Sequence, residues 1–294
     1  MNSSTTRISN GRLTVDVAAL GAEMQSLTSA DGKSWLWNGD AAFWTGRAPI
    51  LFPMVGKAPD NRIRIDGTSY DMAQHGFARR AEFSLAASTQ TMCRFELAPS
   101  EATRAVYPFE FLLAVEYLLE GPRLTVSATV ENRGRDAMPF GLGFHPAFLW
   151  PLPGSEGRPH RVTLDNGGEP AMVRLQDGLV GPDLLPSPFV DGALTLDHAM
   201  FDADAMIFPD GAGNGLTYAV EGGPALKLSV DNLPNLALWS KPGVDPAPPF
   251  LCIEPWHGTA AEVGSSGELA QRPYSILLPE GQTQRFSWSV ELPG

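Results

Sequence analysis

The chain has 294 residues and a formal net charge of −12, which argues against nucleic acid or an anionic membrane surface as its main partner, because both require a basic footprint. Its 30 glycines and 26 prolines, with only 18% charged residues, indicate many turns between short elements, a composition more typical of all-β proteins than of helical ones. The two cysteines, Cys93 and Cys252, lie too far apart in sequence for a C-x-x-C motif.

Alternating apolar and polar residues predict strands along the chain. In NRIRID, residues 61–66, Ile63 and Ile65 face one side, and Arg62 and Arg64 face the other. Further strands are predicted at residues 123–132, 225–232, 250–255 and 285–292. The turn sequences DGKS, DGTS, NRGR, EGGP and PEGQ separate such runs.

The stretch from Pro151 to Val190, rich in Pro, Gly and Asp, is predicted as a long excursion between strands. No segment carries a sustained 3.6-residue apolar stripe, so the helices are expected to be few and short. We therefore predict an all-β fold, a large antiparallel β-sandwich with one open face, in a single domain spanning residues 1–294. No apolar run approaches the roughly 20 residues of a membrane span, and we expect a cytoplasmic monomer or homodimer.

Three of the five histidines stand in unusual settings. His75 lies in QHGFAR, His145 in GLGFHPAF, and His257 in CIEPWHG three residues after Glu254. Residues that precede proline are restricted to extended backbone, so His145 and Glu254 are predicted at strand ends. Alternation through residues 250–255 sends Glu254 to the face opposite the core. The remaining two histidines, His160 and His198, are predicted as loop residues without partners.

These residue types suit proton transfer to and from a small neutral substrate. An imidazole and a carboxylate can act as acid and base, each contributing typically about 10²–10⁴ in rate. Aromatic side chains near them, such as Trp256 and Phe144, suit stacking on the apolar face of a sugar ring. Anomerisation of a sugar meets this description.

Three motifs in order, NRIRIDGTSYDMAQHGFAR, GLGFHPAF and CIEPWHGTA, resemble the aldose 1-epimerase (galactose mutarotase) superfamily. The resemblance runs from about Leu13 to Leu292, includes WLWNGD and LFPMVGKA, and is greatest to the short bacterial branch named for lactose-operon members. It implies the galactose mutarotase-like supersandwich, a sugar substrate, and no cofactor or metal.

The resemblance also implies roles for individual residues. Glu254 would be the base at the C1 hydroxyl, His145 the acid at the ring oxygen, and His75 would hold the sugar and assist the acid. The expected sugar-binding residues are Arg62, Asp204, Trp256, Gln74 and Phe144, with Asp202 and Asp231 as alternatives to Asp204.

Four other readings stay open. Imidazole and carboxylate could hold a transition metal through His75, His145, Glu254 or His257. A glycosidase could pair Glu254 with Asp204 or Asp231. The basic residues Lys57, Arg62, Arg64, Arg79 and Arg80 favour a hexose 6-phosphate mutarotase. The last alternative is a non-catalytic carbohydrate-binding protein.

Overall fold

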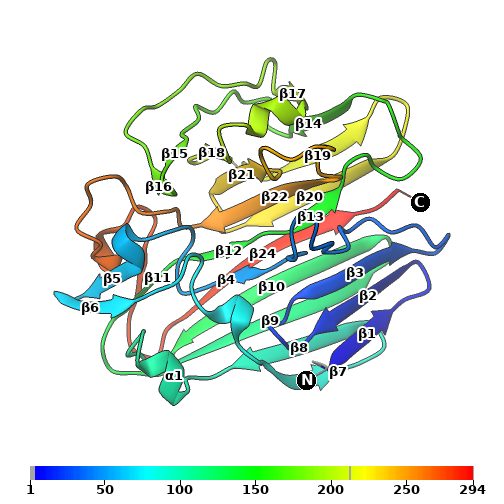
Figure 1. Cartoon of the computed structure of the whole chain (residues 1–294). Coiled ribbons are helices and arrows are strands. Elements are labelled where there is room, and N and C mark those ends of the chain that lie inside the picture. The colour runs from blue at the N-terminus through cyan, green and yellow to red at the C-terminus, as the bar shows by residue number, and fades with distance from the viewer. Residues whose placement is uncertain (1–3, 212, 294) are drawn as a thin grey trace.

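The computed structural model describes residues 4–211 and 213–293, and it consists mainly of antiparallel strands. A nine-stranded sheet forms one layer (Figure 1). Its strands, in spatial order, are β17 (Ala193–Thr195), β14 (His160–Leu164), β19 (Gly215–Val220), β20 (Ala225–Asp231), β24 (Thr283–Glu291), β10 (Arg123–Asn132), β9 (Phe111–Glu120), β8 (Met92–Leu97) and β7 (Ser84–Ser88).

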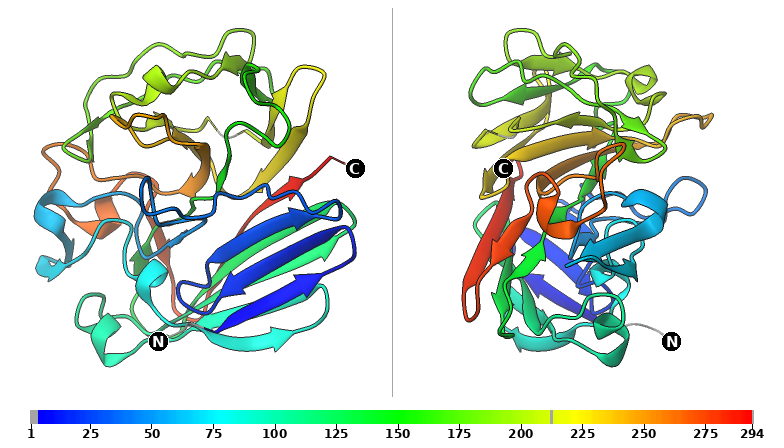
Figure 2. Two further views of the ribbon diagram at one scale, coloured as in Figure 1. Left: turned by 45° about the vertical axis from the view of Figure 1, so that its right-hand side comes forward. Right: turned by 90° about the vertical axis from the view of Figure 1, so that its left-hand side faces the viewer.

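Two smaller sheets pack on this layer, as the two views in Figure 2 show. The six-stranded sheet contains β18 (Met206–Phe208), β21 (Asn235–Trp239), β22 (Phe250–His257), β12 (Leu142–Phe144) and β4 (Ile50–Leu51), with β13 (Ala147–Leu149) pairing with β22 beside β12. The three-stranded sheet contains β1 (Thr5–Ser9), β2 (Leu13–Ala18) and β3 (Met24–Ser29).

Three hairpins or strand pairs complete the fold: β5 (Arg62–Ile65) with β6 (Thr68–Asp71), β11 (Met138–Phe140) with β23 (Ile276–Leu278), and β15 (Leu175–Gln176) with β16 (Leu179–Val180). The described helices are short, as predicted: α1 (Glu101–Arg104) and 3-10 turns at Pro59–Asn61, Ala78–Arg80, His198–Phe201 and Leu269–Gln271. None of the helices in these ranges has the length and hydrophobicity to cross a membrane.

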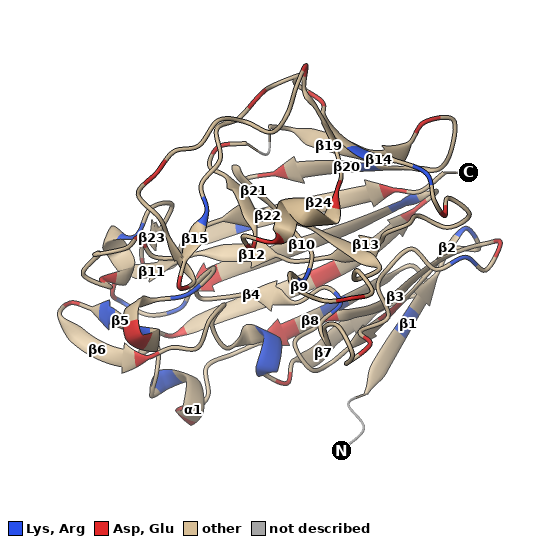
Figure 3. Ribbon diagram, turned by 45° about the horizontal axis from the view of Figure 1, so that its top comes forward, with Lys and Arg blue, Asp and Glu red and all other residues tan. Residues whose placement is uncertain are grey.

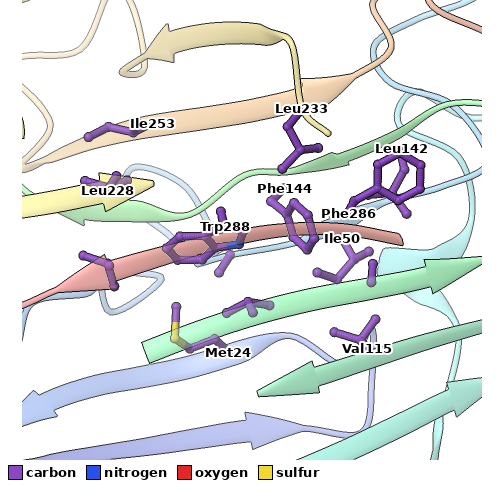
Figure 4. Close-up of a cluster of buried hydrophobic side chains, with 14 of the residues drawn as sticks. Met24, Ile50, Val115, Leu142, Phe144, Leu228, Leu233, Ile253, Phe286 and Trp288 are labelled. Atoms are coloured by element: carbon purple, nitrogen blue, oxygen red, sulfur yellow. The ribbon is translucent and has the colours of Figure 1, made fainter. Parts of the chain in front are cut away.

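The main core lies between the sheets (Figure 4). Strand alternation explains this core, since four residues that share one face of β10 are all buried: Leu124, Val126, Ala128 and Val130. The Trp288 ring of β24 meets the rings of Phe144 and Phe148 from the six-stranded sheet. The sandwich prediction is therefore confirmed.

This core draws on residues from Ile8 to Leu292. A single domain would give that arrangement, and the domain assignment stays a prediction. The stretch from Pro151 to Val190 contains more regular secondary structure than expected. It supplies β14 to the nine-stranded sheet and forms the β15–β16 hairpin. Acidic and basic residues are interspersed along the ribbon (Figure 3).

Candidate active site

A cleft of about 350 Å³ lies on the outward face of the six-stranded sheet, the face opposite the main core. Strand alternation on β22 creates this division. Leu251 and Ile253 belong to the main core, whereas Glu254 faces the cleft, as the sequence predicted. The same sheet that closes the core therefore carries the polar site on its other side.

Strand register places His145 beside Glu254. The strands before and after His145, β12 and β13, both pair with β22 in one continuous register, which puts His145 level with Glu254. On the opposite side of β22, β21 places Ala237 across from Glu254. Because alanine is small, the row His145, Glu254, Ala237 leaves room above the carboxyl group.

His145 and Glu254 form a buried pair at the bottom of the cleft. His145 Nε2 lies 3.1 Å from Glu254 Oε2, and the two side chains are only 9% and 2% exposed. Burial raises the pKa of Glu254 well above its usual range, with a further rise from the negative charge of Asp204 and a smaller opposing effect from the Trp256 indole. Burial lowers the pKa of His145 to about 3. This buried environment therefore favours the neutral form of each group.

His75 lies against this pair, with ring centroids 5.7 Å apart from His145 in an edge-to-face arrangement. The main-chain N–H of Gly56 donates to His75 Nδ1 at 3.1 Å. Burial lowers the pKa of His75, so the neutral ring carries its proton on Nε2. Nε2 lies 3.2 Å from the terminal amide of Gln74, which also lines the cleft. A protonated Nε2 needs an acceptor there, so the Gln74 amide oxygen must face it.

The backbone at His75 is strained to reach this position. His75 has a φ of 65° and Gly76 a φ of 72°. A Cβ on Gly76 would lie 2.1 Å from the carbonyl oxygen of Phe52. Glycine is required here because the chain passes so close to its neighbour.

Two tryptophans form aromatic walls beside the pair. Trp44 stacks on the His145 ring with centroids 5.0 Å apart, and Trp239 meets the same ring edge-on at 5.9 Å. The Trp239 Nε1–H donates to Asp204 Oδ1 at 2.9 Å, and Arg174 binds the Asp204 carbonyl at 2.6 Å. Asp204 therefore lines the cleft in a fixed orientation, whereas Asp202 and Asp231 do not line it.

Unsatisfied polar atoms gather in this cleft. Eight buried side-chain polar atoms within residues 4–211 and 213–293 have no hydrogen-bond partner, and four of them belong to residues that line the cleft: Arg79, His145, Glu254 and Trp256. Buried polar groups are usually satisfied, so such a concentration indicates a place where water or a polar ligand supplies the partners.

Several lining residues carried no local signal in the sequence. Trp44 comes from the loop before β4, Trp239 from β21, and Lys241 follows β21, where its Nζ donates to the Phe43 carbonyl at 2.7 Å. Only the tertiary fold brings these distant side chains together. Arg79, one of the basic residues noted in the sequence, also lines the cleft, and its pKa is lowered to about 10 by burial and by the neighbouring Arg80.

Two expected sugar-binding residues lie elsewhere. Arg62 is exposed and pairs with Asp71 across the β5–β6 hairpin, which is not part of the six-stranded sheet. Phe144 is 1% exposed and points into the core, because it precedes His145 on an extended strand and so faces the opposite side (Figure 4). Neither residue lines the cleft.

The remaining histidines have partners outside the cleft, although His160 and His198 were predicted as loop residues without partners. His160 is buried on β14 and accepts a hydrogen bond from the main chain of Leu152 at 2.9 Å. His198 stacks on Trp150. His257 approaches the Asn232 carbonyl at 2.9 Å and does not line the cleft. Neither His257 nor His75 belongs to the group of possible metal ligands that contains His145 and Glu254.

Comparison with known proteins connects this cleft to one family. Residues 4–272 match the model of the family described as aldose 1-epimerase. The chain is 28% identical to the chromosomal protein LacX of Lactococcus lactis subsp. lactis, over 98% of this chain and 99% of that one. It resembles the structure of a galactose mutarotase related enzyme from Lactobacillus acidophilus, with 27% identity and a TM-score of 0.92 over 99% of this chain and 98% of that one. It also resembles the structure of a galactose mutarotase-like protein from Lactobacillus casei, with 29% identity and a TM-score of 0.92 over 99% of this chain and 100% of that one.

Proposed function

The chain belongs to the aldose 1-epimerase family, and we propose that it interconverts the α and β anomers of a hexose by acid/base opening and closure of the ring. One observation carries this proposal: His145 Nε2 and Glu254 Oε2 lie 3.1 Å apart at the bottom of an aromatic-walled cleft. The C1 hydroxyl and the ring oxygen of a sugar are bonded to the same carbon. Two groups at this spacing can therefore reach both oxygens at once.

In the proposed reaction Glu254 takes the proton from the C1 hydroxyl while His145 protonates the ring oxygen. The bond between C1 and the ring oxygen breaks and leaves the free aldehyde. Rotation about the C1–C2 bond and reversal of both proton transfers give the other anomer. His75 donates its Nε2 proton to the ring oxygen as a hydrogen bond and holds the sugar in place.

The neutral resting pair is compatible with this chemistry. A neutral carboxyl facing a neutral imidazole holds the same number of protons as a carboxylate facing an imidazolium. Transfer of one proton from the carboxyl to the imidazole would therefore give the reactive pair without exchange with solvent. The 3.1 Å contact is not an aligned hydrogen bond, so we expect the transfer once bound sugar has aligned the two groups. Sugar hydroxyls would supply hydrogen bonds to Glu254 Oε2 and His145 Nδ1, and so stabilise the charged form.

The cleft walls fit a sugar ring. Trp44, Trp239 and Trp256 offer aromatic surfaces for its apolar face. Asp204 and Gln74 offer polar groups for its hydroxyls. Asp204 already accepts the Trp239 indole N–H at Oδ1, which leaves its other oxygen for a sugar hydroxyl.

A hexose 6-phosphate mutarotase is the second candidate. Arg79 and Lys241 line the same cleft, and a cation pair of this kind binds phosphate groups. The buried Arg79 Nε has no partner within the described residues. Competition by inorganic phosphate distinguishes the candidates, because a neutral-sugar enzyme would tolerate phosphate.

The test of the function is anomer exchange of freshly dissolved α-glucose, α-galactose and their 6-phosphates, followed by polarimetry or NMR. We expect acceleration of at least one pair of anomers well above the spontaneous rate. Sugar binding with no acceleration for any of them would refute catalysis and identify a carbohydrate-binding protein.

A further inference from the structure

Glu254 and His145 have a third chemically important neighbour, the thiol of Cys252. Cys252 and Glu254 are two residues apart on β22 and therefore share a face, with His145 opposite them. The imidazole nitrogen, the sulfur and the carboxylate oxygen all lie within 4.8 Å of one another, and all three residues are buried. Within the described residues this is the one such group of three His, Cys, Asp or Glu side chains.

We propose that His145, Cys252 and Glu254 form a binding site for a thiophilic divalent metal ion such as Zn²⁺, and that the bound ion blocks the catalytic pair. Nitrogen, sulfur and carboxylate oxygen are the ligands that zinc takes from proteins. Three protein ligands with one open position are typical of accessible zinc sites. His145 and Glu254 line the cleft, so we expect the open position to face it, where water or a sugar oxygen could complete a tetrahedron.

The distances require only a local adjustment. Zinc bonds of about 2.0–2.3 Å in a tetrahedron place neighbouring ligand atoms about 3.3–3.7 Å apart. The 3.1 Å separation of His145 Nε2 and Glu254 Oε2 is already close to that value. The separations to the sulfur are at most 4.8 Å, so the sulfur would have to move inward by no more than about 1 Å, which a small rotation of the Cys252 side chain can supply.

A metal ion would also remove an electrostatic problem of the site. Glu254 Oε2 is buried without a hydrogen-bond partner; the ion would give that oxygen a partner, and its positive charge would compensate the carboxylate that binds it. On binding, Glu254 and Cys252 bond to the ion as carboxylate and thiolate, and any protons they carry pass to the buffer. His145 bonds through Nε2 and stays neutral.

Inhibition follows from occupancy, and this part rests on the proposed function. The ion uses Nε2 of the acid and an oxygen of the base, so neither can exchange a proton with the sugar. Metal binding itself does not depend on the activity. The two parts can therefore fail separately.

Metal-free protein is titrated with Zn²⁺, and bound metal is measured after equilibrium dialysis in the wild type, Cys252→Ala and Cys93→Ala. Cys93 is the matched control, because it is the other cysteine, is also buried, and lies on β8 in the nine-stranded sheet. We expect one ion per chain in the wild type and Cys93→Ala. In Cys252→Ala, affinity should fall at least about tenfold, since loss even of an outer-shell partner costs 10–100-fold.

Co²⁺ provides a readout that is independent of activity and of the folding of Cys252→Ala. In Cys93→Ala the only remaining thiol is Cys252, so a thiolate-to-cobalt absorption band there assigns the ligand. Absence of that band, or equal zinc affinity in all three proteins, would overturn the site. If the band is present but Zn²⁺ leaves anomer exchange unchanged in an active enzyme, the blocking role is wrong.

Discussion

The neutral state of His145 should by itself lower the stability of the protein in mild acid, whereas the raised pKa of Glu254 acts in the opposite direction. Burial lowers the pKa of His145 from 6.5 to about 3. His145 therefore binds a proton near pH 6.5 in the unfolded chain, but stays neutral in the folded chain until the pH falls to about 3. The stabilising contribution is thus present above pH 6.5 and is lost as the pH falls towards 3. At 1.36 kcal/mol per pH unit, going from pH 7 to pH 5 should cost about 2 kcal/mol through this residue alone.

Replacement by a residue that does not titrate removes this cost. We expect His145→Gln to lose about 2 kcal/mol less unfolding free energy than the wild type between pH 7 and pH 5. Urea unfolding followed by tryptophan fluorescence at the two pH values measures the difference, which does not depend on the absolute stability of the variant. His198→Gln, at a half-buried position, should follow the wild type more closely. Equal losses in the wild type and His145→Gln would refute the claim that burial keeps His145 neutral.

Three other predictions concern substrate binding and the backbone at the site. Arg79→Ala should raise KM, because Arg79 lines the cleft. Arg62→Ala should leave the steady-state kinetics unchanged, because Arg62 does not line the cleft and its exposed ion pair with Asp71 contributes under about 1 kcal/mol to stability. Trp239→Phe keeps an aromatic wall but removes the N–H that orients the cleft aspartate, so KM should rise more than kcat falls; an unchanged KM would contradict that role. Gly76→Ala should lower the free energy of unfolding, measured in urea, by at least about 3 kcal/mol, because the added Cβ would lie 2.1 Å from a carbonyl oxygen. Gly11→Ala, with open space around it, should lower it by about 1 kcal/mol.

The sequence predicted the fold and part of the site because both follow from local patterns. Alternation over residues 123–132 predicts the strand that β10 forms, with the same bounds. The alternation on β22 places Glu254 on the polar face. The strand end predicted there from the restriction before proline is wrong, because β22 continues to His257. His145 and His75 join it because their motifs sit on segments that border β22 and the cleft.

The failures come from relations between segments, which a local pattern does not contain. Alternation correctly turned Arg62 away from the core, but the β5–β6 hairpin that carries it is separate from the sheet of Glu254. Phe144 was expected in the site although its place before His145 on a strand sends it inward. Trp44 and Trp239 reach His145 from distant segments, so no single motif could have shown them.

The central claim is that His145 and Glu254 act as one proton-transferring pair, and equilibrium anomer exchange measured by NMR tests it most directly. The wild type is compared with His145→Gln, Glu254→Gln and the double variant on the sugar that the wild type turns over fastest. Each single variant should lose at least about 100-fold, and the double variant should be no slower than the slower single one, because groups that act as a unit are not additive. Single variants within a few-fold of the wild type, or losses that multiply in the double variant, would contradict the pair.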